Sequence, residues 1–460
     1  MNSQDVSVVE VRKRYGRSIR STTPRLSLAT LSERPEGYDA VARLREQGAT
    51  RVANLLPLRY ARMLESPLAF YRGAALLMAD DLVRGASTSL EVQICGDAHL
   101  CNFGVFSSPE RQMVFDVNDF DETDVAPFEW DVKRLVASLA IASEQLGHSA
   151  RQQERIALAA AREYRGSMMR FAEQTRLEVW YARLDTDSVM SDLKGFFSDS
   201  AKRKVDDVVQ SAKETDAACA FSKVVVYGDE GPTIVVDPPH FTRLDASDGG
   251  SLGVAEVYGI IAGYGVTLSS DRQVLLKQFR VRDAARHVVG VGSVGTECFA
   301  VLLVGRDDRD PFFLQIKEAQ RSVLADARAT EETLEAGERV VRGQKLMQAT
   351  SDAFLGWHTT QFADRPRSFY VRQLYDNKAS VDVERLDESL LVAYGRLCSW
   401  TLARAHARSG RGAEIAGYLG KGDRFEESMA AFALAYRDRN RADYEALKGD
   451  VARGGITVAT

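Results

Sequence analysis

Residues 96–104 read GDAHLCNFG, and residues 117–122, slightly further along the chain, read VNDFDE. Between them lie two short apolar runs around a polar turn at residues 107–111, and the residues before Gly96 alternate between apolar and polar. This pattern predicts a strand, a loop and a hairpin. The loop would then face the end of the hairpin.

The residue types in this loop and hairpin point to phosphate chemistry. The loop offers Asp97 and Asn102, and Asp119 follows seventeen residues after Asn102. Carboxylate and amide oxygens are hard ligands of the kind that Mg²⁺ requires. In such a site Asp97 would orient or deprotonate an attacking hydroxyl, while Asn102 and Asp119 would hold one or two Mg²⁺ ions that bridge nucleotide phosphates. Taken alone, an Asp-rich run is more often a solvated turn.

A second pattern, GVGSVG at residues 290–295, fits two kinds of nucleotide site. In a dinucleotide-binding fold the glycines open a helix, and an acidic residue follows about 20 positions later. Here a strand-like segment, residues 296–304, comes next, turns, and returns as residues 312–316 before Lys317. A glycine-rich hairpin with a lysine on the next strand is the arrangement of protein kinases, and we favour it.

Together the two patterns resemble the protein-kinase-like superfamily, particularly its aminoglycoside and choline phosphotransferase branch, with the order of the two parts reversed. The chain as a whole is similar to an uncharacterised bacterial family, the domain of unknown function DUF2252, over about residues 35–440. The motifs that carry this likeness are YRGAA, GDAHLCNFG, NDFDE, WDVKRL, GVGSVGT, LQIKEA, FYVRQLYDNK and LARAHARSG.

The resemblance implies a role for each matching residue of the first half. Asp97 would be the catalytic aspartate, and Asn102 and Asp119 would be metal ligands. Asp121 would lie on the same side of an extended strand as Asp119 and assist it, while Asp116 is a weaker contender. Two further residues are assigned to bracing the loop, namely His99 and Asp131.

In the other half, the resemblance implies that backbone amides of the glycine loop approach the nucleotide phosphates. The glycines concerned are Gly290, Gly292 and Gly295. Lys317 would contact the α and β phosphates and pair with a helical glutamate. The available glutamates are Glu332, Glu335 and Glu338, and we choose Glu338 because it begins the most regular helical stretch. Gln373 and Leu374 would form the hinge beside the adenine.

The fold that the resemblance implies is an α+β, bilobal, protein-kinase-like fold with a permuted order of lobes. A small β-rich lobe would bind the nucleotide, and the larger lobe would be mainly helical. The expected segments are a loosely ordered basic arm at 1–35, a helical lobe with the catalytic and metal loops and an insertion at 36–279, the β-rich lobe at 280–378, and completing helices at 379–460.

Periodicity gives a coarse secondary structure that is independent of this likeness. Apolar residues recur at intervals of three and four in stretches that predict helices. These are residues 37–83, 127–142, 188–213, 334–348 and 386–408. Residues 369–374 predict a strand.

Composition excludes several classes of protein. Of the 460 residues 45% are hydrophobic and 27% charged, which is typical of a globular chain rather than a disordered or collagenous one. The 60 basic and 65 acidic residues leave a net charge of −5, so nothing in the overall charge favours nucleic acid or an anionic membrane as a partner.

The cysteines and the apolar runs suggest a compartment. The 5 cysteines are widely spread and never spaced as CxxC, which argues against a disulfide framework or a zinc knuckle. No apolar run reaches the length of a membrane span, and the amino terminus does not resemble a secretory signal. We therefore expect a cytoplasmic protein, and the sequence does not indicate its oligomeric state.

The function expected from these observations is transfer of the γ-phosphoryl group of ATP, with Mg²⁺, to a hydroxyl of an unidentified small molecule or protein. Transfer of AMP is a variant that the residues leave open. The alternatives are a metal-dependent phosphoesterase that needs no nucleotide, and a nucleotide-binding pseudokinase without activity.

Overall fold

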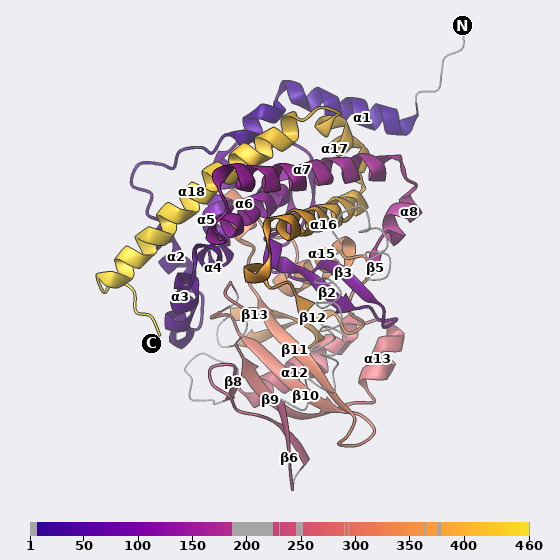
Figure 1. Cartoon of the computed structure of the whole chain (residues 1–460). Helices are drawn as coiled ribbons and strands as arrows, with labels where there is room; N and C mark the ends of the chain where they lie inside the picture. The colour runs from indigo at the N-terminus through magenta and orange to yellow at the C-terminus, as the bar shows by residue number, and fades with distance from the viewer. Residues whose placement is uncertain are drawn as a thin grey trace.

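The computed structural model describes residues 7–185, 224–229, 231–244, 252–288, 290–292, 294–362, 365–374 and 379–459. The fold belongs to the α+β class expected from the sequence, with 53% helix and 18% strand. Most helices gather in the upper part of Figure 1, and the largest sheet lies in the lower part. The helix predicted over 188–213 and Cys219 lie outside the described residues. No helix in the described ranges is long and apolar enough to cross a membrane.

The largest sheet has six antiparallel strands. In order across the sheet they are β12 (Gly356–Phe362), β13 (Arg365–Gln373), β11 (Pro311–Ala319), β10 (Cys298–Val304), β9 (Arg280–His287) and β8 (Phe241–Arg243). Every residue of β10 is buried, as expected for a central strand covered on both faces. Lys317 on β11 lies opposite Cys298 on one side and Tyr370 on the other. The predicted strands therefore form the centre of this sheet.

One face of the sheet is covered by residues expected in the helical lobe. They form α12 (Val254–Tyr264), η6 (Gly265–Thr267) and α13 (Ser270–Leu276). Ile260 and Tyr264 pack in one hydrophobic core with Phe299 and Leu314, because this removes their apolar surface from water. The β-rich unit thus begins before residue 280, which corrects the predicted boundary.

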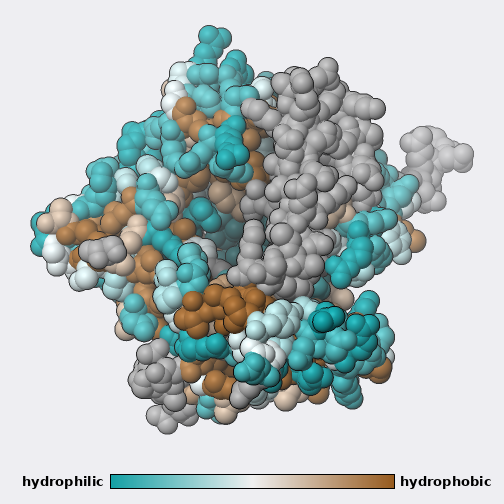
Figure 2. All heavy atoms as spheres, turned by 60° about the horizontal axis from the view of Figure 1, so that its bottom comes forward, coloured by the Kyte–Doolittle hydropathy of each residue, from teal (hydrophilic) through white to brown (hydrophobic). Residues whose placement is uncertain are grey.

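A hairpin of β6 (Val225–Gly228) and β7 (Gly231–Ile234) packs on the same unit. The amide of Ile234 donates to Asp283 on β9 at 2.7 Å. This end of the molecule exposes several large apolar side chains, and Figure 2 shows brown patches among hydrophilic residues there. The exposed large hydrophobic residues of the hairpin and of α12 to α13 are Val226, Tyr227, Val254, Val266 and Val274.

The GDAHLCNFG motif lies among short strands between the helices and the large sheet. Strand β1 (Glu91–Ile94) pairs with β4 (Asp124–Pro127), and β2 (Phe103–Ser107) pairs with β3 (Met113–Val117). Two very short strands, β14 (Ala379–Ser380) and β5 (Leu184–Asp185), flank this second pair. The predicted strand, loop and hairpin are confirmed, and the loop ends in η4 (Leu100–Asn102).

The helical part is built around α6 (Glu129–Gln145), which is buried along most of its length. It is surrounded by α7 (Ala150–Glu173), α16 (Glu388–His406) and α18 (Arg424–Ala452). The described residues also form α2 (Ala40–Gly48), η3 (Ala53–Leu55), α3 (Leu56–Leu64), α4 (Pro67–Gly73), α5 (Ala75–Arg84), α8 (Arg176–Tyr181), α14 (Val323–Arg328), α15 (Ala336–Met347), η7 (Val383–Arg385), η8 (Ala407–Arg411) and α17 (Gly412–Leu419).

The amino-terminal segment differs from the loosely ordered arm that we expected. It forms α1 (Val8–Ser18), η1 (Ile19–Ser21) and η2 (Arg25–Ala29), and α1 packs against α17. The helices approach closely because glycines face each other's backbone: a Cβ on Gly16 would lie 1.9 Å from the carbonyl oxygen of Glu414. Arg20 and Arg25 donate to the last carbonyls of α17, which lack helical partners. The basic residues therefore serve helix packing here.

Candidate functional site

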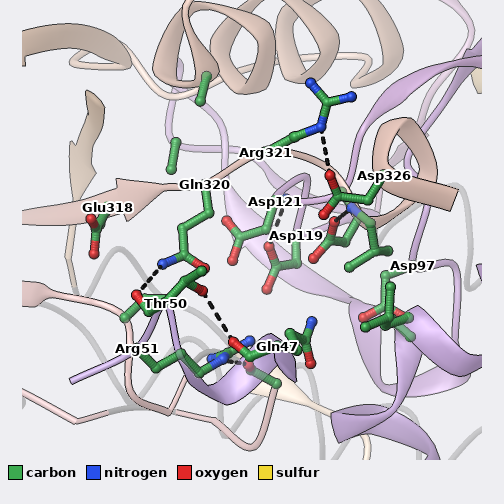
Figure 3. Close-up of a pocket in the computed structure, with 18 of the residues that line it drawn as sticks. Gln47, Thr50, Arg51, Asp97, Asp119, Asp121, Glu318, Gln320, Arg321 and Asp326 are labelled. Carbon is green, nitrogen blue, oxygen red and sulfur yellow. Dashed lines mark hydrogen bonds and ion pairs between the residues drawn. The ribbon is translucent and has the colours of Figure 1, made fainter. Parts of the chain in front are cut away.

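A cavity of about 640 Å³ lies where the early helices meet the β11 end of the large sheet. Six of the predicted site residues line it, namely Asp97, Asn102, Asp119, Asp121, Gly290 and Gly292. In Figure 3 the side chains of Asp119 and Asp121 point into the space between Thr50 and Gln320 on one side and Asp97 on the other. Segments that are nearly two hundred residues apart thus share one cavity.

The hairpin brings Asn102 and Asp119 together. Its register pairs Phe103 with Val117, and the amide of Asn118 donates to the carbonyl of Asn102 at 2.9 Å. The hairpin therefore brings Asn102 and Asp119 close together, although they are seventeen positions apart in the sequence. The side-chain amide of Asn102 donates to the carbonyl of Asp97 at 2.8 Å, which fixes the loop and leaves its Oδ1 oxygen available as an acceptor.

The loop is supported from below by Asp131 at the start of α6. Asp131 accepts hydrogen bonds from the amides of Cys95 at 2.8 Å and Gly96 at 2.9 Å. Its Oδ2 lies 3.2 Å from His406 Nε2, and His406 Nδ1 in turn lies 2.8 Å from the hydroxyl of Tyr164. This places Asp131 in the bracing position that the sequence suggested.

Gly96 adopts a backbone conformation that a side chain would not tolerate. Its φ is +81°, in the left-handed region that favours glycine, and a Cβ there would lie 2.1 Å from the carbonyl oxygen of Glu122. The GDAHLCNFG loop therefore lies directly against the backbone of the NDFDE segment.

The carboxylate of Asp97 is held by an arginine that the sequence analysis did not single out. Arg134 Nε donates to Asp97 Oδ1 at 2.7 Å, and its Nη2 donates to the carbonyl of Tyr71 at 2.8 Å. Burial raises the pKa of Asp97 above its ordinary value, although the charge of Arg134 acts in the opposite direction. His99 Nε2 lies 3.6 Å from Asp97 Oδ2. One oxygen of Asp97 is thus fixed, while the other lies toward the cavity residue His99.

Lys317 is 2% exposed and forms ion pairs with both aspartates of the NDFDE segment. Its Nζ lies 3.6 Å from Asp119 Oδ2 and forms a closer pair with Asp121 Oδ2. Tyr370, the cross-strand neighbour of Lys317, donates its hydroxyl to Asp121 Oδ1 at 2.8 Å. Burial would lower the pKa of Lys317, but the charges of Asp119 and Asp121 outweigh it and hold that pKa above its ordinary value.

The predicted pair between Lys317 and Glu338 does not occur. Glu338 pairs instead with Arg342, one turn further along α15, at 2.5 Å. The other two candidates are also engaged elsewhere: Glu332 pairs with Arg339, and Glu335 accepts from Thr359. The NDFDE segment therefore supplies the partners of Lys317 in place of the helix.

Helix α15 contributes a cation to the site in place of the expected acid. Arg339 donates to the carbonyl of Thr123 at 2.5 Å and to that of Asp121 at 3.0 Å. Glu122 accepts from the amide of Val323 at 2.7 Å, and burial raises the pKa of Glu122 to about 7. The segment that carries the two aspartates is thus held to α15 and α14.

This pairing leads to a first prediction. Glu338→Gln removes only an ion pair with a largely exposed arginine, so it should change the free energy of unfolding by less than about 1 kcal/mol and leave any activity unchanged. Asp121→Asn removes the closest partner of Lys317 and should lower any turnover of Mg-ATP by about 10²-fold. Measuring the turnover rates of the two variants in parallel tests this prediction. A larger loss of activity in the Glu338 variant would contradict this prediction and favour the pair between Lys317 and Glu338.

The glycine loop is anchored to the early helices through its carbonyls. Arg51 donates to the carbonyls of Gly292 at 2.8 Å and Val294 at 2.7 Å, and Arg62 donates to that of Gly290 at 2.6 Å. The amide of Val52 also donates to the carbonyl of Gly295 at 2.7 Å. Gly290 and Gly292 line the cavity, whereas Gly295 lies behind them against Arg51.

Three other predicted positions lie away from the cavity lining. Gln373 lines a separate small pocket, and the amide of Leu374 donates to the carbonyl of Phe313 at 3.0 Å. A hinge at these two residues is therefore not part of the main cavity. Asp116 is 1% exposed and bonded to Arg404 at 2.5 Å, which makes it a buried structural residue and removes it as a metal candidate.

The donor set of the cavity fits Mg²⁺. Among the described residues no cluster of three or more His, Cys, Asp or Glu side chains could hold a metal ion by itself. Mg²⁺ in nucleotide sites commonly takes only one or two carboxylates, with waters and substrate phosphates completing the octahedron. Asn102 and Asp119 supply hard oxygens on one wall of the cavity, so they suit an ion that arrives with a nucleotide.

Sequence reasoning missed most of the cations around this site. Arg134, Arg51 and Arg339 lie on helices or loops whose apolar spacing shows only that they are helical or irregular. The one usable signal was the WDVKRL motif, in which Arg134 lies three residues after Asp131 and thus on the same face of α6.

Comparison with known proteins gives one match. The family model described as "Uncharacterized protein conserved in bacteria (DUF2252)" matches residues 51–450. No curated protein and no solved structure matches the chain.

Proposed function

The chain belongs to the DUF2252 family, and from that starting point we propose that its cavity binds Mg-ATP and transfers the γ-phosphoryl group to a hydroxyl. The observation that carries this proposal is the meeting of Asp97, Asn102 and Asp119 with Lys317 and the glycine loop in one place. These are the parts that phosphoryl transfer needs, since it depends on positioning and charge stabilisation.

The proposed fold is protein-kinase-like and bilobal, with the lobes in permuted order. Several features of the large sheet support it: the glycine loop joins β9 to β10, the lysine lies on the following strand β11, and helix α15 comes between β11 and β12. Kinases place a glycine-rich loop, a strand lysine and a helix in this succession. The catalytic loop precedes these elements in the chain here, and it would follow them in a kinase.

The residues of the chain would divide the work as follows. Arg134 holds one oxygen of Asp97, so that its other oxygen can orient the acceptor hydroxyl and take its proton. The raised pKa of Asp97 suits it to receive a proton. Asn102 and Asp119 would hold Mg²⁺, which when bound neutralises charge on the phosphates. Lys317 would contribute a fixed positive charge beside them.

The test is isothermal titration with ATP and Mg²⁺, followed by mass spectrometry of the γ-phosphate after incubation with a pooled metabolite extract and with protein substrates. We expect binding that requires Mg²⁺ and is lost on chelation, and a new phosphorylated product. Release of inorganic phosphate from phosphoesters without nucleotide would favour the phosphoesterase. Binding without product would favour the pseudokinase. AMP attached to a product would identify the adenylyl-transfer variant.

A further inference from the structure

Arg72 lies at the end of α4, beside the catalytic loop. Its side chain lines the cavity together with Asp97, His99 and Asn102. After burial, the charge of Arg72 is the largest influence that lowers the pKa of His99, and the same charge also acts on Asp97. The guanidinium therefore faces the catalytic end of the cavity.

Within the described part of the chain, the side chain of Arg72 has neither a hydrogen-bond partner nor an ion-pair partner, and its Nε is buried without one. Of the other arginines that line the cavity, Arg365 is exposed at the start of β13, and the rest are engaged. Arg51 donates to the glycine loop, Arg43 pairs with Asp80, and Arg321 pairs with Asp326. A partly buried, unpaired cation is costly unless an anion completes it. Arg72 is thus the partly buried one among the cavity arginines whose guanidinium a bound anion would complete.

The position of Arg72 indicates which anion. Its carbonyl oxygen would lie 3.1 Å from a Cβ on Gly292, so α4 ends against the glycine loop, and Arg72 lines the same cavity as Asp97. A group held between the loop and Asp97 is the one being transferred. The planar guanidinium suits it, because its donors match two phosphoryl oxygens at once.

We propose that Arg72 binds the γ-phosphoryl group of ATP and stabilises its charge during transfer, an inference that rests on the proposed function. In that step the bond between the γ phosphorus and the β,γ-bridging oxygen breaks, and a bond from the acceptor oxygen to the phosphorus forms. The acceptor proton passes to Asp97, and ADP leaves with the bridging oxygen. Arg72 forms no covalent bond and keeps its charge throughout.

The experiment compares the parent protein with Arg72→Ala and Arg72→Lys. Affinities for ADP and for the non-hydrolysable ATP analogue AMP-PNP, both with Mg²⁺, are measured by titration, and turnover of ATP is measured separately. We expect Arg72→Ala to weaken AMP-PNP about 10-fold, to leave ADP unchanged, and to lower kcat about 10²-fold. Arg72→Lys should recover part of the affinity for AMP-PNP and less of kcat, since lysine cannot bind two oxygens in one plane.

The matched control is Arg342→Ala, which removes an arginine that is 62% exposed on α15. It should change neither affinity nor rate. Arg72→Ala should not lower the unfolding midpoint of the nucleotide-free protein, because Arg72 has no partner to lose. Equal weakening of ADP and AMP-PNP, or of neither, would overturn the role of Arg72 while leaving the proposed function standing. A parent protein that binds neither nucleotide would instead overturn the proposed function itself.

Discussion

Asp97→Asn is expected to slow phosphoryl transfer by about 10³-fold while leaving nucleotide affinity nearly unchanged. The substitution keeps the shape of the side chain, so Arg134 can still donate to its oxygen. It removes the proton acceptor and the negative charge that orients the hydroxyl. Because Asp97 faces the acceptor and not the nucleotide in this proposal, the loss should appear in kcat.

Asp119→Asn provides the contrasting variant, since it alters the metal site. It should also lower kcat, by at least about 10²-fold, and it should raise the Mg²⁺ concentration needed for half-maximal rate. A suitable control is Asp308→Asn, in the turn between β10 and β11, whose side chain is 47% exposed and pairs with Arg280. If the Asp97→Asn and Asp119→Asn proteins both turn over ATP at the parent rate, then Asp97 and Asp119 have no part in the mechanism.

The second large effect concerns stability. Asp116→Ala is expected to lower the free energy of unfolding by about 3–5 kcal/mol, because it leaves the guanidinium of Arg404 buried without its counter-charge. Both side chains are 1% exposed, and Nε and Nη1 of Arg404 already have no hydrogen-bond partner. Asp116 also accepts from the amide of Ala349 at 2.8 Å, so the loop before β12 would lose an anchor.

A double-mutant cycle separates the ion pair from the packing. Arg404→Met combined with Asp116→Ala should cost less than the sum of the two single substitutions, since the double variant has no unpaired buried charge. Urea unfolding followed by circular dichroism gives the four free energies. If Asp116→Ala costs under about 1 kcal/mol, or the costs simply add, then the pair does not contribute as described.

The large sheet was predictable where its strands are central. Residues 296–304 and 312–316 form apolar runs that became β10 and β11, because a strand covered on both faces carries apolar residues at nearly every position. β12 at the edge was not predicted. Its sequence, GWHTTQF, is mostly half-buried and lacks clear alternation, so its pairing with β13 comes from tertiary context.

The candidate site divides in the same way. Asp97, Asn102 and Asp119 could be grouped from sequence because one short hairpin joins them, and local spacing fixes their distance. The partner of Lys317 could not, because it depends on which helix face turns toward β11. Packing between α15, β1 and β13 makes that choice: Arg339 contacts the carbonyls of Thr123 and Asp121, while Glu338 pairs with Arg342.

The support of the catalytic loop has a consequence for synthesis of the protein. Asp131, which fixes the loop, is in turn contacted by His406 at the end of α16. Translation delivers the loop first and its final brace much later, since chains emerge from the amino terminus. A nascent polypeptide stalled before residue 406 would therefore carry every proposed catalytic group and still lack the buried imidazole that contacts Asp131 beneath the loop.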